Sequence, residues 1–265
     1  MGFRSRQQPR RCAALFSIIG AVLGWLFGPP VTASAQTAAQ LLNAPEQLLQ
    51  RIDQIRAPAD TFVFKLKLTA YRGTQVSSVT SFTVHVKGSS KSLVKFTAPP
   101  KSKGRVVLMN GDNLWIYIPG SQRALRISPR QRLLGQVAYG DVARVVYSLD
   151  YRADRVAEDT VQGKRALRLE LTAQSKGATH DRIHLWVDPD TLRPIKANFL
   201  ALSGKLLKVG YYKGYRWAVG RHRPMILEVH DAIRKEQYSI LEYSRMRLED
   251  TPARFFQRTY LEHVR

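Results

Sequence analysis

Residues 101–151 read KSKGRVVLMNGDNLWIYIPGSQRALRISPRQRLLGQVAYGDVARVVYSLDY, and this stretch decides the fold class. It contains three short runs rich in apolar and aromatic residues, at Arg105–Met109, Asn113–Ile118 and Arg123–Ile127. Asn-Gly-Asp separates the first two runs and Pro-Gly-Ser separates the last two, and both tripeptides are typical of tight turns. The pattern therefore predicts an antiparallel meander of three strands.

A loop and a short helix are expected after the meander. Ser-Pro-Arg ends the strand pattern, and residues 133–140, LLGQVAYG, follow neither the period of a strand nor that of a helix. A long apolar loop of this kind is usually a lid or a binding loop. Asp141 is then a candidate N-cap for a short helix over residues 141–147.

Apolar residues alternate with polar ones on both sides of this stretch. The clearest runs lie at residues 62–68 and 82–86 before it and at residues 167–171 and 183–187 after it. Residues 41–56 instead place leucines and isoleucines at helical spacing and end before a proline. About a dozen strands joined mainly by short turns predict one mainly β domain, either a barrel or a strongly curled sheet. An aromatic tail near the C-terminus is expected to dock on it.

Residues 1–35 have the features of a secretory signal peptide. Four arginines precede an apolar core at residues 13–27, Pro-Pro follows this core, and Ala-Ser-Ala ends the segment. We therefore expect cleavage before Gln36, which leaves residues 36–265 as a single domain. An uncleaved membrane anchor is the alternative, although the apolar core of about 15 residues is shorter than the roughly 20 that span a bilayer.

The chain is strongly basic. It contains 42 Lys and Arg against 20 Asp and Glu, a formal net charge of +22. Such an excess attracts polyanions, and with an export signal an anionic membrane or a membrane-embedded partner is a better candidate than nucleic acid. A merely solvated arginine-rich surface is the alternative. The single cysteine, Cys12, lies within the predicted signal, so the mature protein is expected to fold without disulfides.

No motif indicates catalysis. The sequence contains neither a G-x-S-x-G elbow nor a glycine-rich phosphate loop. His180 and His184 are four residues apart in a predicted strand, which separates their imidazoles by roughly 13 Å, too far to share a metal ion. Asp188 and Asp190 flank a proline and are typical of a turn. The sequence therefore favours a protein that is not an enzyme and needs no metal or cofactor.

Apolar surface is abundant on the predicted strands and on the loop. A hollow lined by such residues can shelter acyl chains, at about 0.8 kcal/mol per buried CH₂ group. The same side chains can equally pack an ordinary core, and the sequence leaves both interpretations open. The residues expected to line or gate a hollow are Phe62, Phe64, Leu66, Trp115, Tyr117, Leu133 and Leu134. Gly135 is the expected hinge of the loop, and Arg123 and Arg126 are candidates to face lipid head groups or a membrane.

Several motifs carry a resemblance to a known family. Lys-Gly-Arg leads a strand at 103–105, WIYIP follows at 115–119 and RALRI at 123–127, and a glycine-containing loop closes on YGDV at 139–142. Over about residues 95–152, this order resembles the outer membrane lipoprotein-sorting branch of the LolA-like superfamily.

The resemblance implies an incomplete, strongly curled antiparallel β-barrel of about 11–12 strands, with helices covering its open side. It also implies a monomeric periplasmic carrier that shelters the acyl chains of a lipid or lipoprotein during transport towards the outer membrane. The implied partner is an inner-membrane transporter of the resistance-nodulation-division type. The alternative is a basic periplasmic adaptor that carries nothing and docks on an anionic membrane or on such a transporter.

Overall fold

The computed structural model describes residues 42–57, 59–121 and 123–261. The predicted signal peptide lies outside these ranges. Helices α2 (Pro45–Arg56), α3 (Tyr139–Ala143) and α4 (Arg258–Leu261) and the 3-10 helix η1 (Ala253–Phe256) accompany the strands. The strands are β1 (Thr61–Arg72), β2 (Gln75–Lys87), β3 (Lys91–Ala98), β4 (Val106–Asn110), β5 (Asn113–Tyr117), β6 (Leu125–Ile127), β7 (Arg132–Leu134), β8 (Val137–Ala138), β9 (Tyr151–Val161), β10 (Lys164–Ala173), β11 (Arg182–Val187), β12 (Pro194–Leu200), β13 (Leu206–Lys213), β14 (Arg216–Ala218), β15 (Arg221–Arg223), β16 (Ile226–Asp231) and β17 (Gln237–Leu248). Of the helices in the described ranges, none has the length and apolar character needed to cross a membrane.

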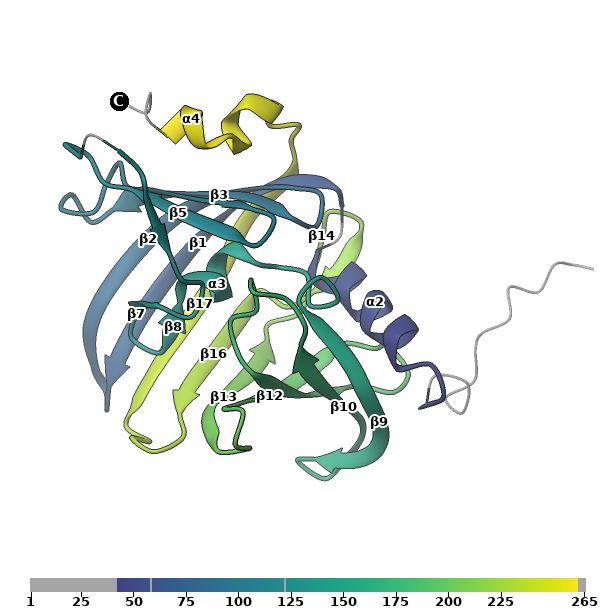
Figure 1. Cartoon of the computed structure of the whole chain (residues 1–265). Helices are drawn as coiled ribbons and strands as arrows, with labels where there is room; N and C mark the ends of the chain where they lie inside the picture. The colour runs from purple at the N-terminus through teal and green to yellow at the C-terminus, as the bar shows by residue number, and fades with distance from the viewer. Residues whose placement is uncertain (1–41, 58, 122, 262–265) are drawn as a thin grey trace, which may run out of the picture. The chain divides into compact units, whose positions relative to one another are not determined.

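Thirteen of the described strands form one antiparallel sheet in the order β6-β5-β4-β3-β2-β1-β17-β16-β13-β12-β11-β10-β9. Two meanders meet in its middle, because β1 pairs with β2 on one side and with β17 on the other. The edges, β6 and β9, do not pair, so the sheet curls without closing (Figure 1). The predicted incomplete, strongly curled β-barrel is confirmed, with thirteen strands in the sheet where about 11–12 were expected.

One face of the sheet, called here the inner face, carries the main core. Phe62, Phe64 and Leu66 of β1 lie on it with at most 1% of their surface exposed. Both meanders contribute to this cluster, and α2 adds Leu48 and Ile52, as its amphipathic spacing predicts. Burial of each such side chain contributes about 1.5–3 kcal/mol.

The opposite face of β3–β5 carries a second, smaller core. Leu93, Val106 and Leu108 are buried there beneath η1 and α4, which contribute Phe256 and Leu261. Both of these tail residues are essentially fully buried. The predicted docking of the aromatic tail is therefore confirmed, and the tail covers the outside of the first meander.

Asp141 and Asp188 accept hydrogen bonds from backbone N–H groups and so stabilise a helix start and a turn. α3 begins at Tyr139, so Asp141 is its third residue and not the N-cap predicted from the sequence. Its carboxylate reaches back to accept a hydrogen bond from the Ala138 N–H at 2.8 Å, which places the capping group inside the first turn. Asp188 accepts hydrogen bonds from the N–H groups of Asp190 and Thr191, and this confirms the predicted turn.

Candidate functional site

The chain passes from one edge of the sheet to the other through residues 128–150, called here the connecting segment. It contains the β7–β8 hairpin and α3, which lie within the curl of the sheet (Figure 1). Val137, Val142 and Ala143 of this segment are buried in the main core. The stretch that was predicted to be a lid therefore packs directly on the inner face.

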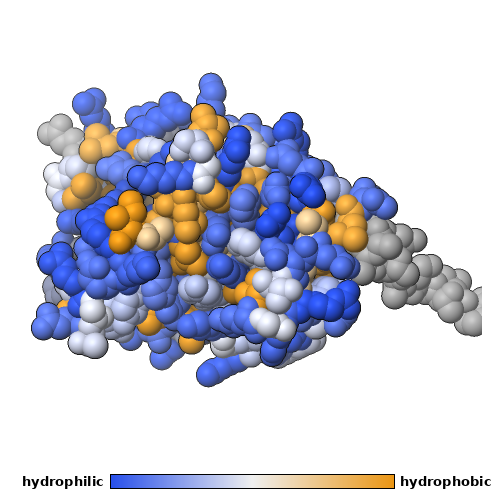
Figure 2. All heavy atoms as spheres, turned by 90° about the horizontal axis from the view of Figure 1, so that it is seen from below, coloured by the Kyte–Doolittle hydropathy of each residue, from blue (hydrophilic) through white to orange (hydrophobic). Residues whose placement is uncertain are grey.

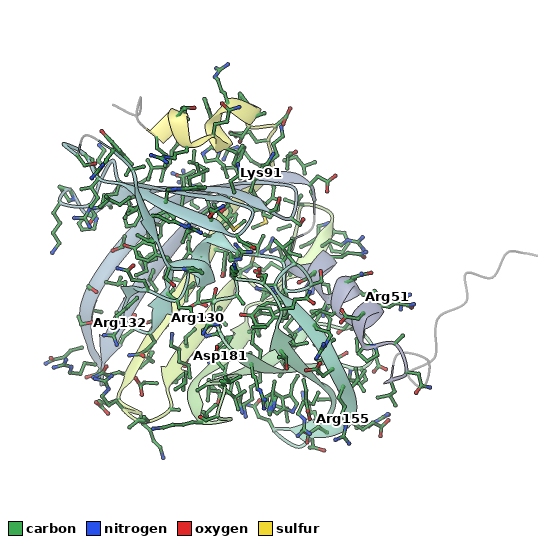
Figure 3. The ribbon with its side chains drawn as sticks, in the orientation of Figure 1. Arg51, Lys91, Arg130, Arg132, Arg155 and Asp181 are labelled. Atoms are coloured by element: carbon green, nitrogen blue, oxygen red, sulfur yellow. The ribbon has the colours of Figure 1, made fainter. Side chains whose placement is uncertain are left out.

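Individual polar contacts attach the connecting segment to the sheet. The Gln136 N–H donates to Ser239 Oγ at 3.0 Å, and the Gln136 side-chain amide donates to Gln237 Oε1 at 3.2 Å. Arg130 forms an ion pair with Asp181 near the start of β11 (Figure 3). Because β7 and β8 pair only with each other, the segment is not part of the main hydrogen-bond ladder. Its displacement would break none of the ladder hydrogen bonds between the thirteen strands of that sheet.

Gly135 occupies the tip of the hairpin with φ +53°. A Cβ atom at this position would lie 2.3 Å from Ser239 Oγ and 2.7 Å from the Ala70 Cβ atom, so only glycine permits this approach to β1 and β17. The structure thus places Gly135 at a close contact with the sheet, where the sequence suggested a hinge.

The predicted cavity residues fall on both faces of the sheet. Phe62, Phe64 and Leu66 lie on the inner face, and Leu133 and Leu134 are half-buried against the same core. All five residues therefore pack in or against the main core, Leu133 and Leu134 as part of the connecting segment itself, and none of them lines the pocket described below.

Trp115 and Tyr117 lie on the other face of β5, where they pack on the second core beneath the C-terminal tail. The inner positions of this strand are occupied by Leu114 and Ile116. Both faces of β5 are apolar, so alternation alone identifies two faces but not which of them is covered by the tail.

The two predicted head-group arginines lie near the β6 edge. Arg123 and Arg126 are both exposed. Arg126 is paired with Trp115 in the β5–β6 ladder, and directly opposed residues project to the same side of a sheet. Arg126 therefore shares the face that carries the tail and does not face the inner side.

A pocket opens on the inner face of the second meander. Its space is about 840 Å³, including the part that is open to solvent. Arg56 of α2, Tyr212 of β13, Arg223 of β15 and Tyr243 of β17 line it together with Tyr147 of the connecting segment. Apolar residues of the main core, among them Phe199, Leu227 and Val229, complete the wall. The pocket thus joins the apolar core to a group of polar side chains.

Arg56 reaches this pocket from the last turn of α2. Its guanidinium carbon lies 3.5 Å from the centroid of the Tyr147 ring, a cation–π contact, and its Nη1 atom lies 3.5 Å from Asp53 Oδ1. Asp53 also accepts hydrogen bonds from the N–H groups of Tyr147 at 2.7 Å and Ser148 at 2.6 Å. Burial raises the pKa of Asp53, although Arg56 and the two N–H groups oppose this shift. These contacts attach α2 to the connecting segment.

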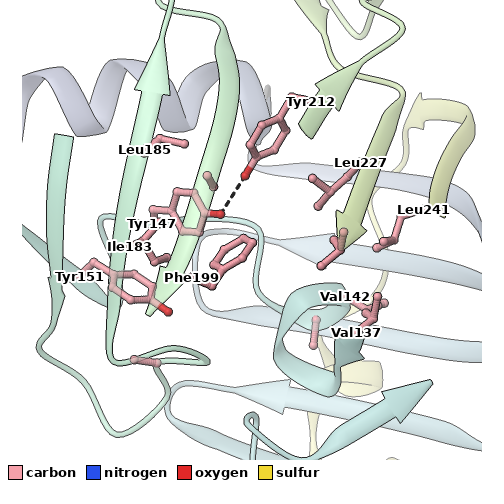
Figure 4. Packing of buried hydrophobic residues seen from close by; sticks show 14 of the residues in the cluster. Val137, Val142, Tyr147, Tyr151, Ile183, Leu185, Phe199, Tyr212, Leu227 and Leu241 are labelled. Atoms are coloured by element: carbon pink, nitrogen blue, oxygen red, sulfur yellow. Dashed lines mark hydrogen bonds between the residues drawn. The ribbon is translucent and has the colours of Figure 1, made fainter. Parts of the chain in front are cut away.

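Two tyrosine hydroxyl groups meet inside the pocket. The hydroxyl oxygens of Tyr147 and Tyr212 are 2.9 Å apart, and the two side chains point toward each other (Figure 4). Burial raises the pKa of both phenols, and it raises the pKa of nearby Tyr243 to about 12. All three therefore stay neutral at physiological pH and can donate hydrogen bonds.

Arg223 is a buried cation, with only 4% of its surface exposed. Its guanidinium carbon lies 6.0 Å from the ring centroids of Phe62 and Tyr243, and its Nη1 atom donates to the sulfur of Met246. The Nε atom has no hydrogen-bond partner in the described part of the chain. Burial lowers the pKa of Arg223 to about 10, which leaves it charged at neutral pH.

The other charged groups of the pocket wall are paired. Arg144 forms a buried ion pair with Asp150, and His180 Nε2 lies 2.8 Å from Asp141 Oδ1. Burial alone would raise the pKa of Asp141, but His180 and the Ala138 N–H lower it to about 2. This part of the wall is therefore a pre-formed set of neutralised pairs.

Sequence reasoning did not find the polar side of the pocket. Arg56 follows Ile52 by four residues and Leu49 by seven, so it lies on the apolar stripe of the helix. A charged residue on an apolar stripe is a sequence signal that could have pointed to the pocket. Arg223 and the three tyrosines gave no such signal, because four separate segments bring them together.

Comparisons with solved structures identify the fold. A LolA superfamily protein from Nitrosomonas europaea is similar at 32% identity and a TM-score of 0.76, over 82% of this chain and 98% of that one. A DUF1329 family protein from Desulfovibrio piger is similar at 21% identity and a TM-score of 0.71, over 83% and 98%. A domain from Vibrio parahaemolyticus, described as an outer membrane lipoprotein-sorting protein domain, is similar at 17% identity and a TM-score of 0.71, over 83% and 99%.

Comparisons at the level of sequence add a family model. The model that matches residues 88–263 has the description "-like: Uncharacterized protein". No curated protein matches the chain. The chain is 32% identical to the Nitrosomonas protein over nearly the whole of that protein, and the two folds are similar. The chain therefore belongs to the LolA superfamily.

Proposed function

We propose that the protein carries a lipid, or the lipid-modified end of a lipoprotein, and shelters the acyl chains against the inner face of its sheet. One observation carries the proposal: a single apolar cluster extends over both meanders on the inner face, and the connecting segment that packs on it lies outside the sheet ladder. Membership in the LolA superfamily supports the same function.

A lipid that replaces the segment has to offset the contacts that the segment loses. Each buried CH₂ group of an acyl chain contributes about 0.8 kcal/mol. The segment gives up the partial burial of Leu133 and Leu134 and the nearly complete burial of Val137 and Val142. On the face seen from below, apolar side chains gather near the middle and are surrounded by hydrophilic ones (Figure 2). Such a patch is typical of a binding site or an interaction surface.

The cellular setting is part of the proposal. Residues 1–35 direct export and are removed, and the protein then works in the periplasm, delivering its lipid towards the outer membrane. An inner-membrane transporter of the resistance-nodulation-division type is the proposed source of that lipid. The net charge of +22, which becomes +18 once the four arginines of residues 1–35 are removed, also favours contact with anionic membranes, and it is the observation behind the alternative of an adaptor that carries nothing.

Extraction of the purified protein with organic solvent, followed by mass spectrometry, tests the carrier. We expect a lipid to co-purify with the wild-type protein in a defined ratio. Leu133→Asp combined with Leu134→Asp is expected to reduce lipid retention at least about tenfold, because two charges are placed where acyl chains enter.

The matched control is Leu125→Asp, on β6 close to the same stretch, where half of the side chain is already exposed. It should retain lipid like the wild type. Wild-type protein that yields no lipid after exposure to membranes would instead support the adaptor.

A further inference from the structure

The pocket wall carries Arg223, for which the described residues supply no carboxylate partner, and Arg56, whose acid partner Asp53 is shared with two backbone N–H groups. Arg144 is paired with Asp150, and Asp141 is paired with His180. Arg56 and Arg223 are the remaining cations that line the pocket. The wall therefore has a positive centre within a largely apolar surface.

The nearest acid is already occupied. Asp53 is 3.5 Å from Arg56, a long contact, while its two oxygens accept shorter hydrogen bonds from the backbone N–H groups of Tyr147 and Ser148. Most of the hydrogen-bonding capacity of Asp53 thus goes to the connecting segment. Arg56 keeps donors that can serve a ligand.

Arg223 is the stronger indication. Across the described ranges, no carboxylate forms an ion pair with it, its Nε atom lacks any partner, and its side chain donates its one hydrogen bond to a thioether sulfur. A thioether is a weak acceptor, and an uncompensated buried charge destabilises a fold. The side chain is more than nine-tenths buried and still lines the pocket. A buried cation in this position is suited to bind an anionic group of a ligand.

We propose that this pocket binds the phosphate of an anionic phospholipid head group. Arg223 presents its guanidinium fork to two phosphate oxygens and Arg56 supplies the second positive charge, the arrangement by which arginine recognises oxyanions. The hydroxyls of Tyr147 and Tyr212 are hydrogen-bonded to each other, so one of the two keeps a proton that it can donate to a phosphate oxygen from the same wall.

Apolar side chains adjoin this site. Phe199, Leu227 and Val229 line the same pocket as the two arginines and belong to the main core, and Phe199 and Leu227 lie near the tyrosine pair (Figure 4). This inference rests on the proposed carrier function and adds the ligand class to it.

The test compares three probes on purified protein. Dioleoylphosphatidylglycerol has acyl chains and a phosphate, dioleoylglycerol has the same chains without phosphate, and inorganic phosphate has no chains. We expect the wild type to bind the phospholipid at least about tenfold more tightly than dioleoylglycerol, since charge-assisted hydrogen bonds are lost with the phosphate.

Arg223→Met is the decisive variant, because methionine fills the space beside Met246 without a charge. It should remove the preference for the phospholipid and leave dioleoylglycerol binding unchanged, while its Tm without lipid stays equal or rises. Arg223→Lys, which keeps the charge and loses the fork, should bind the phospholipid with intermediate affinity. Arg221→Met, at an exposed position of the same strand, is the matched control and should behave like the wild type.

The outcomes separate the two proposals. Equal binding of both lipids by the wild type, or an unchanged preference in Arg223→Met, overturns the phosphate site and leaves the carrier intact. A lower Tm in Arg223→Met with parallel loss of both lipids also overturns it, since the arginine would then be structural. If neither lipid binds, the carrier fails, and the phosphate site stands only if inorganic phosphate raises the Tm of the wild type and not of Arg223→Met.

Discussion

The two meanders of this sheet use the same inner face in different ways. In the first meander, Phe82 and Phe96 pack edge to face with their centroids 4.8 Å apart, beside a space of about 160 Å³ lined mainly by apolar residues. In the second, Phe199 borders a pocket of about 840 Å³ that also contains Arg223 and Tyr212. Both halves border pockets, and they differ in what lines them, because among the described residues only the pocket of the second half contains buried arginine and paired tyrosine side chains.

Replacing one phenylalanine in each half of the sheet by alanine tests this difference most directly. Phe82→Ala removes a fully buried ring from the packed half and should lower the free energy of unfolding by about 3–5 kcal/mol. Phe199→Ala should cost about 1–2 kcal/mol less, because the new space joins an existing pocket and leaves a smaller added cavity.

Urea denaturation of both variants measures the difference. Val79→Ala, at an exposed position on the same strand as Phe82, is the control and should change the free energy of unfolding by no more than about 0.5 kcal/mol. Equal costs for the two phenylalanines would mean that both halves are packed alike.

The charged wall makes the second half sensitive to acid. The pKa of Asp141 is about 2 in the folded protein, against 3.8 for an ordinary aspartate, so its stabilising contribution is present above pH 3.8. That contribution, about 2 kcal/mol, is lost as the pH falls from about 4 towards 2. Asp141→Asn should therefore lose about 2 kcal/mol at pH 7 and show a flatter dependence of stability on pH below 4.

The free energy of unfolding measured between pH 7 and pH 2 checks this expectation. Phe82→Ala serves as a comparison, since it should lower stability equally at every pH. Parallel curves for Asp141→Asn and the wild type would show that the Asp141–His180 contact contributes nothing to stability.

The smallest effect is expected for the tyrosine pair. Tyr212→Phe removes one hydroxyl and its 2.9 Å contact with Tyr147, and it should lower the free energy of unfolding by about 1 kcal/mol. The ring itself remains, so thermal unfolding should still show a single transition. A loss above about 3 kcal/mol would mean that the Tyr147–Tyr212 hydrogen bond is needed for core stability. That result would count against a ligand pocket at this position.

Much of the fold was predictable because its signals are local. The alternation over residues 62–68 and 167–171 identifies strands, the spacing in α2 identifies its apolar stripe, and Asn-Gly-Asp and Pro-Gly-Ser locate the turns. Each pattern is set by the period of the backbone, which depends on neighbouring residues only.

The candidate site was predictable only in part. Phe62, Phe64 and Leu66 lie on the inner face as expected, because β1 has its bulkiest residues on one side. Trp115 and Tyr117 do not, because β5 is apolar on both sides and the C-terminal tail decides which side is the outer one. A strand pattern identifies faces, but the element that covers each face comes from elsewhere in the chain.

The sequence by itself determined a curled antiparallel β protein with an amphipathic helix, a docked aromatic tail and an apolar segment after the meander of residues 105–127. Only the tertiary structure decided that this segment lies on the inner face and that Arg56, Tyr212 and Arg223 share one pocket. The physical reason is the pairing of β1 with β17, which joins the two meanders and brings distant residues together through contacts that no local period encodes.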